Sequence, residues 1–169
     1  NVWQILFFRS LALTPLLLLV MTLRARGNPF PTIQSAGLAG IFGGFSLVFA
    51  FSGGIMAIQT TTVANAMFLF AAAPFFAAVL GWLVLKENVP KATWLSMIAA
   101  LVGIAIMVWE SISLGKIIGN IAALISALGF AVFTISLRWK KLEDMLPAVF
   151  LAGFFAIIAA GILCQINGY

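Results

Sequence analysis

The sequence lacks histidine altogether, and among its 169 residues it has one cysteine and four acidic side chains. Without histidine, histidine-based catalysis and most zinc or haem ligation are excluded. A lone cysteine, Cys164, excludes an intramolecular disulfide and a multi-cysteine metal site. The acidic residues leave little for acid–base chemistry or cation binding: Glu87, Glu110, Glu143 and Asp144. We therefore expect no enzymatic activity, no metal site and no cofactor.

Charged residues are also scarce, at 8% of the chain, whereas 64% of the residues are apolar. Soluble domains usually have about 25% charged and about 45–50% apolar residues. The mean hydropathy of +1.20 agrees with this imbalance. The composition predicts a protein that is surrounded by a lipid bilayer. The net charge of +5 is then expected to lie in loops at a membrane face, and no nucleic-acid partner is expected, because no long basic run is present.

Long apolar stretches account for most of the chain. A helix that crosses the hydrocarbon core needs about 20 mainly apolar residues, whereas membrane strands would be about 10 residues long and alternating. Charges, prolines and glycine clusters divide the chain into six stretches of suitable length: 2–23, 34–58, 63–85, 92–109, 117–137 and 145–164. The predicted fold class is an all-α, polytopic transmembrane helix bundle with six spans in this sequence.

Basic residues are distributed unevenly between alternate loops. One set of loops contains seven of them: Arg24, Arg26, Lys86, Lys91, Arg138, Lys140 and Lys141. The other set contains only Lys116, with Arg9 left aside because it lies inside the first span. Positively charged loops stay on the cytoplasmic side. The loops with seven basic residues are therefore predicted to be cytoplasmic in a multi-pass protein of the cell membrane, and residue 1 lies outside.

Small residues recur every four positions along several spans. The last span has the strictest stripe, formed by Ala148, Ala152, Ala156 and Ala160. Such spacing lets helix backbones approach closely, which is how helices associate within lipid. The stripes predict a tightly packed bundle and carry no information about a ligand.

A few polar residues and one proline interrupt the apolar spans. Arg9 lies about 10 Å into the first span at 1.5 Å per residue, where it either holds an anionic group or reaches the outer headgroups. Asn65 and Asn120 can each bind a ligand or join two helices. Pro74 breaks the hydrogen-bond ladder of the third span and is a candidate hinge. Glu87 lies in the predicted cytoplasmic turn, where it caps a helix, pairs with a lysine or takes part in gating.

Four passages together resemble the EamA-type carriers of the drug/metabolite transporter superfamily. They are Phe7-Phe8-Arg9-Ser10-Leu11-Ala12, then Thr61 to Ala66 running on to Pro74-Phe75-Phe76, then Leu85 to Val89 followed by Trp94 and Gly103-Ile104, and finally residues 115–138. Their order along the chain is more specific than any one passage. Lys86 departs from the pattern, because the family often has glycine before this glutamate.

The resemblance implies a ten-helix carrier built from two five-helix repeats of opposite orientation. Residues 1–110 would form the first repeat without its first helix, and residues 115–169 would begin the second, so the sequence is expected to be a fragment. The implied function is secondary transport of a small organic metabolite or drug by alternating access. The candidate substrate-binding residues are Arg9, Asn65, Phe68 and Asn120, with Pro74 as the hinge.

Two other interpretations are compatible with the sequence. A complete six-span protein would form a homodimer and complete its cavity by symmetry. A membrane assembly factor that does not transport would use its alanine stripes to bind a partner protein. The expected partners of the leading interpretation are a small-molecule solute and the lipid bilayer.

Overall fold

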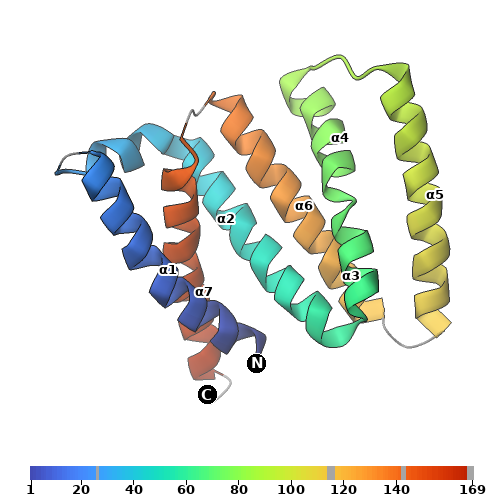
Figure 1. The fold of residues 1–169 in the computed structure, drawn as a ribbon, viewed down its shortest axis with the longest axis horizontal. Helices are drawn as coiled ribbons and strands as arrows, with labels where there is room; N and C mark the ends of the chain where they lie inside the picture. The colour runs from blue at the N-terminus through green and yellow to red at the C-terminus, as the bar shows by residue number, and fades with distance from the viewer. Residues whose placement is uncertain (26, 114–116, 142–143, 167–169) are drawn as a thin grey trace. The chain divides into compact units, whose positions relative to one another are not determined.

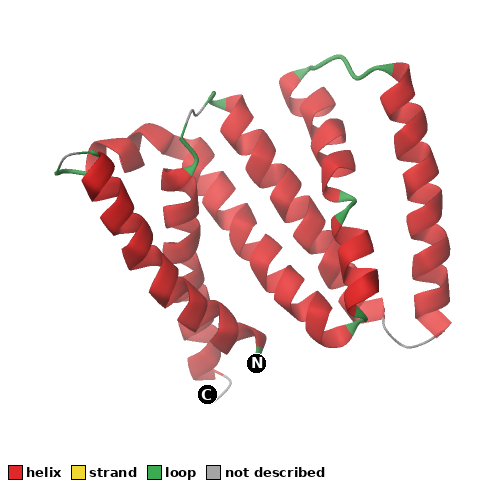
Figure 2. Ribbon diagram, in the orientation of Figure 1, coloured by secondary structure: helices red, strands yellow, loops and turns green. Residues whose placement is uncertain are grey.

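A computed structural model of the chain describes residues 1–25, 27–113, 117–141 and 144–166. Within these residues the chain is helical and has no strand, as Figure 2 shows. The helices, labelled in Figure 1, are α1 (Val2–Arg24), α2 (Phe30–Thr60), α3 (Val63–Phe70), α4 (Ala73–Leu85), α5 (Lys91–Ser113), α6 (Ile117–Trp139) and α7 (Leu146–Ile166). The predicted all-α, polytopic class is confirmed.

Among the described residues, five segments are long and apolar enough to cross a membrane. They are α1, α2, α6, α7 and the segment Val63–Leu85, which contains both α3 and α4. The predicted span at 92–109 corresponds to α5, in which the apolar helical stretch Lys91–Ile106 is shorter than the five segments above. The chain is thus a multi-pass membrane protein.

The helices group into two compact units. The terminal unit comprises Asn1–Val48 and Ser136–Tyr169, and the middle unit comprises Phe49–Ile135. Helices α2 and α6 each contribute residues to both units. The predicted repeats at 1–110 and 115–169 have other boundaries than these two units. The repeats stay a prediction. Gly115, Lys116 and the basic loop residue Arg26 lie outside the described residues.

In the terminal unit, α1 and α7 pack side by side (Figure 1). Helix α1 starts with a capping box between Asn1 and Gln4, which satisfies amide groups that a first turn leaves unpaired. Its buried side chains include Leu6, Ser10 and Thr14. On α7, Gly153 lies against Thr14. The four-residue alanine stripe of α7, Ala148, Ala152, Ala156 and Ala160, is buried, and Gly44 of α2 packs against the backbone of Ala148 and Ala152. The predicted packing role of that stripe is confirmed.

An exposed ion pair links the C-terminal end of α1 to the residue pair that precedes α7. Arg24, in the last turn of α1, lies 3.9 Å from Asp144, just before α7. The end of α1 therefore lies near the start of α7, and the two helices run antiparallel. A pair this exposed contributes about 0–1 kcal/mol, so the apolar and small-residue contacts hold the helices together.

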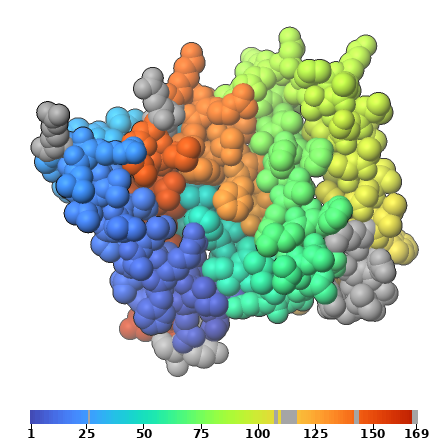
Figure 3. Space-filling model, viewed as in Figure 1, coloured from blue at the N-terminus to red at the C-terminus, as the bar shows by residue number. Residues whose placement is uncertain are grey.

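The surface of α1 that faces away from α7 is apolar. Figure 3 shows this helix in blue, and its exposed side chains include Leu11, Leu16, Leu19 and Leu23. A soluble protein rarely exposes a continuous apolar surface of this kind. The surface is suited to contact with lipid chains.

Helix α2 begins four residues earlier than the sequence pattern indicates. The amide of Phe30 donates to the side chain of Asn28 over 3.0 Å, and Pro31 is tolerated because a first helical turn needs no amide donor. The helix is interrupted at Gly37, whose φ of 51° and ψ of −144° are not helical. This conformation is open almost only to glycine, so Gly37 fixes a break in the span.

Candidate functional site

The predicted third span is divided into two helices near its middle. Helix α3 ends at Phe70 and α4 begins at Ala73, with Pro74 in the first turn of α4. Proline has no amide hydrogen, so the carbonyl of Phe70 loses its intrahelical donor. The connection tightens instead, with Ala72 donating to the Leu69 carbonyl over 3.1 Å. The predicted helix break at Pro74 is confirmed, and its role as a hinge stays a prediction.

A cavity of about 280 Å³ opens beside this break and is called the α4–α6 cavity. It is lined by Ala73, Pro74 and Ala77 of α4 and by Phe130, Ala131 and Thr134 of α6. The Thr134 hydroxyl donates to the carbonyl of Phe130 over 2.9 Å, which satisfies the polar atom within its own helix. The cavity therefore presents small and aromatic groups, and it suits an apolar part of a solute.

The start of α6 is held against the turn between α2 and α3. The hydroxyl of Thr61 donates to Oδ1 of Asn120 over 3.1 Å. Asn120 is only 1% exposed, and its Nδ2 is buried without a hydrogen-bond partner among the described residues. At Gly119, an added Cβ would lie 2.7 Å from the backbone nitrogen of Thr61. Of the two roles predicted for Asn120, the structure displays the contact between helices.

The same turn also positions Asn65. Its backbone amide donates to the hydroxyl of Thr62, the N-cap of α3, over 3.3 Å. Asn65 is half-buried. Asn120 and Asn65 therefore contact adjacent residues of one turn, Thr61 and Thr62 respectively. Phe68 is 65% exposed and does not line the α4–α6 cavity. The structure brings Asn65 and Asn120 to the same turn, whereas Phe68 is exposed on α3.

The remaining predicted residues lie at other places. Arg9 belongs to the terminal unit and is exposed on α1. Glu87 is half-buried in the turn after α4, where its amide donates to the carbonyl of Gly81 over 3.3 Å. The preceding residue, Lys86, has a left-handed backbone with φ 54° and ψ 34°. That conformation favours glycine, so a lysine here carries a steric cost that glycine would not.

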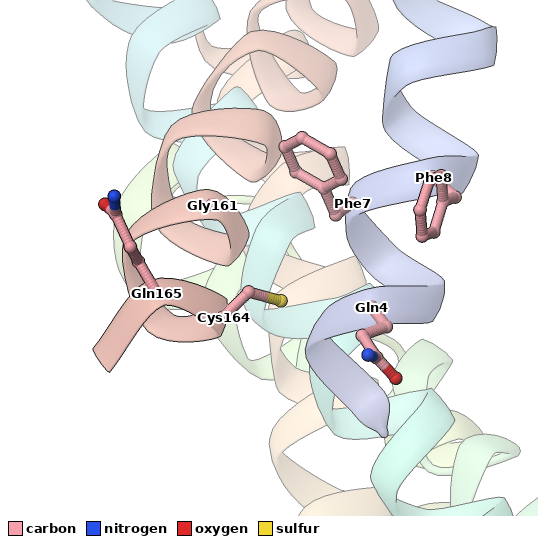
Figure 4. Close-up of a pocket in the computed structure, with 6 residues that line it drawn as sticks. All are labelled: Gln4, Phe7, Phe8, Gly161, Cys164 and Gln165. Carbon is pink, nitrogen blue, oxygen red and sulfur yellow. The ribbon is translucent and has the colours of Figure 1, made fainter. Parts of the chain in front are cut away.

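A second cavity, of about 270 Å³, lies in the terminal unit and is called the α1–α7 cavity. Its lining residues, shown in Figure 4, are Gln4, Phe7 and Phe8 of α1 and Gly161, Cys164 and Gln165 of α7. The sulfur of Cys164 points toward α1, and the ring of Phe7 points toward Gly161 (Figure 4). The ring lies close to the α7 backbone, because an added Cβ at Gly161 would be 3.4 Å from Phe7 Cε2.

The α1–α7 cavity is not among the sites predicted from the sequence. Its two sides are separated by more than 150 positions, and their register is not visible in the sequence. The only sign is a glutamine one helical turn before two phenylalanines in the first span.

Comparison with known proteins gave one positive result. The family model described as the EamA-like transporter family matches residues 1–109. No curated protein and no solved structure matched the chain.

Proposed function

The chain belongs to the EamA-like transporter family, and on that premise we propose that it is part of a secondary carrier for a small organic metabolite or drug. The carrier works by alternating access in the cytoplasmic membrane. The family match, together with five segments of the described chain that are long and apolar enough to cross a membrane, supports a membrane transporter rather than an assembly factor.

One observation carries the mechanistic part of the proposal. The segment Val63–Leu85 has the length and hydropathy of one span, yet it is broken into α3 and α4 beside the α4–α6 cavity. Irregular backbone at membrane depth is tolerated where it is buried in protein or lines a cavity, and broken helices are a common element of transporter binding sites. The break and the cavity together support a place where solute binds and where the span bends.

The proposal also assigns roles to individual residues. In the proposal, α4 changes its angle to α3 at Pro74, which alters access to the cavity. Asn65, Phe68 and Asn120 are proposed contacts for the solute on the middle unit. Arg9 is proposed to hold an anionic group at the outer mouth of the pathway, because a charge within a span usually faces a cavity, a partner or the interface.

The proposed orientation places the basic loops in the cytoplasm. Arg24, Lys86, Lys91, Arg138, Lys140 and Lys141 would then lie on the inner side, and the start of α1 on the outer side. The antiparallel arrangement of α1 and α7 puts the loop after α1 and the loop before α7 on the same side of the membrane, as this orientation requires, and the count of basic residues supports the choice of the inner side. We further propose a ten-helix carrier with two inverted repeats, and cross-linking of the whole protein would separate it from a homodimer.

Solute flux in vesicles tests the function. The whole protein is reconstituted, and uptake is measured for radiolabelled amino acids, radiolabelled nucleosides and ethidium. We expect flux of at least one of them above protein-free vesicles, and a clear reduction in Pro74→Ala. Pro31→Ala is the matched control, because Pro31 also lies in a first helical turn but does not line the cavity. Absence of flux for every probe would contradict the function, and full activity of Pro74→Ala would contradict the hinge.

A further inference from the structure

We propose that the α1–α7 cavity is a binding site for a neutral solute with an aromatic ring and a hydrogen-bonding group. The cavity lies between the first turns of α1 and the last turns of α7, opposite to the end where Arg24 pairs with Asp144. Its volume is about 270 Å³. Ligand pockets are commonly about 300–1,000 Å³, so this cavity suits a small solute of about one ring and a short substituent.

The aromatic part of the inference rests on Phe7 and Gly161. Phe7 and Phe8 form an edge-on pair, with ring centroids 5.7 Å apart and planes at 79°. Because residue 161 has no side chain, the Phe7 ring reaches the backbone of α7 and space stays open beside it. Aromatic rings bind other rings in offset or edge-on geometry. A planar ring therefore suits this cavity better than a branched group.

The neutral part of the inference rests on the remaining lining residues. None of the six lining residues is charged. Transfer of an unpaired ion into such surroundings is strongly unfavourable, whereas a carboxamide both donates and accepts hydrogen bonds. Gln4 Oε1 accepts from the backbone nitrogen of residue 1 over 3.5 Å. The amide hydrogens of the same side chain have no charged group among the lining residues. Gln4 is thus positioned to bond a carbonyl of a neutral solute.

A lipid chain is a poorer occupant of the same space. It would bring no hydrogen-bonding group for the half-buried carboxamide of Gln4, whereas a neutral polar solute would. Arg9 follows Phe8 in the sequence but does not line the cavity. The lining residues therefore favour a neutral polar solute over both an acyl chain and an anion.

This inference rests on the proposed function, in which the start of α1 lies at the outer face. The cavity would then be an outer subsite, occupied as the solute enters or leaves the carrier. Binding here is independent of the bending of α3 against α4, so the two are tested separately. Solute flux without binding at this cavity would support the carrier function and contradict the subsite.

Cys164 provides the readout, since it lines the cavity, is half-buried and is the sole cysteine of this sequence. The whole protein, with any cysteine outside this sequence replaced by serine, is labelled with N-ethylmaleimide in the presence of benzamide, benzoate or benzylamine. These three probes share one ring and differ mainly in charge. We expect benzamide to slow labelling several-fold and the two charged probes to have little effect.

Variants of the lining residues make the experiment specific. Gly161→Leu fills the cavity and should abolish protection by benzamide, whereas Gly161→Ala adds only an ordinary contact with Phe7 and should retain it. Gln4→Ala should weaken protection about 3- to 10-fold, the range for the loss of one hydrogen bond. Gln34→Ala, an exposed glutamine on α2, is the matched control and should have no effect.

Several outcomes would overturn the inference. These are no labelling of the free protein, no slowing by benzamide, or equal slowing by all three probes. Stronger protection by benzoate would reassign the site to anions, with Arg9 as the candidate cation. Protection by dodecanamide but not by benzamide would assign the cavity to a lipid chain.

Discussion

The hydroxyl of Thr61 donates to Oδ1 of Asn120 over 3.1 Å and joins the start of α6 to the turn before α3. We expect Asn120→Ala to lower the free energy of unfolding by about 0.5–1.5 kcal/mol, because the change removes the hydrogen bond of the partly buried Thr61 hydroxyl. In a double-mutant cycle with Thr61→Val, the interaction free energy between residues 61 and 120 should be about 0.5–1.5 kcal/mol. Unfolding in detergent, followed by circular dichroism, measures both.

The control for this prediction is Asn88→Ala, since Asn88 is exposed in the turn after α4. It should leave stability nearly unchanged. A coupling near zero, together with loss of solute flux in Asn120→Ala, would show that Asn120 acts mainly on the solute and not as a link between helices.

A second prediction concerns the break in α2. Gly37→Ala places a Cβ on a backbone with φ 51° and ψ −144°, although nothing lies within 4 Å of it. The change should destabilise the protein by about 1–3 kcal/mol through backbone strain alone. Gly103→Ala, which also meets nothing within 4 Å but lies inside α5, should be neutral or stabilise by about 0.5–1 kcal/mol. Equal effects of the two variants in thermal unfolding would contradict the break.

A third prediction concerns the contact of α1 with α7. An added Cβ at Gly153 would overlap Oγ1 of the buried Thr14. Gly153→Ala should therefore destabilise the protein by about 1–3 kcal/mol, as overpacking does in a tight interface. Gly161→Ala, on the same helix, should have a small effect. Thr14→Ala should restore stability to Gly153→Ala, and a failure of this rescue would place the strain elsewhere.

A fourth prediction concerns Lys86, whose left-handed backbone ends α4. Lys86→Gly should be about 1 kcal/mol more stable than Lys86→Ala, because glycine adopts this conformation without steric cost. Both variants remove the same positive charge from the helix end, so their difference isolates the backbone. Equal unfolding temperatures for the two variants would show that the turn does not require glycine geometry.

The sequence predicts most of the helices because each needs about 20 apolar residues, and charges and prolines separate them. The break beside Pro74 is predictable for the same reason, since proline cannot donate within a helix. The break at Gly37 is not, because Gly40, Gly43 and Gly44 follow it and nothing local distinguishes one glycine from the others.

Much less of the candidate site could be predicted. Asn120 is recognisable as an unusual polar residue, but its partner Thr61 lies 59 positions away. The α1–α7 cavity depends on the register between two distant helices, so Gly161 and Cys164 are ordinary span residues until that register is known. Local composition determines the spans, whereas the contacts between spans require the fold.

The division of Val63–Leu85 also bears on how the protein enters the membrane during synthesis. At 1.5 Å per residue, α3 would be about 12 Å long and α4 about 20 Å, each too short for a hydrocarbon core of about 30 Å. Neither piece could therefore leave the translocon as a stable span on its own. The two must partition into lipid together as one insertion unit, and the bend at Pro74 must form within the bilayer or at its edge.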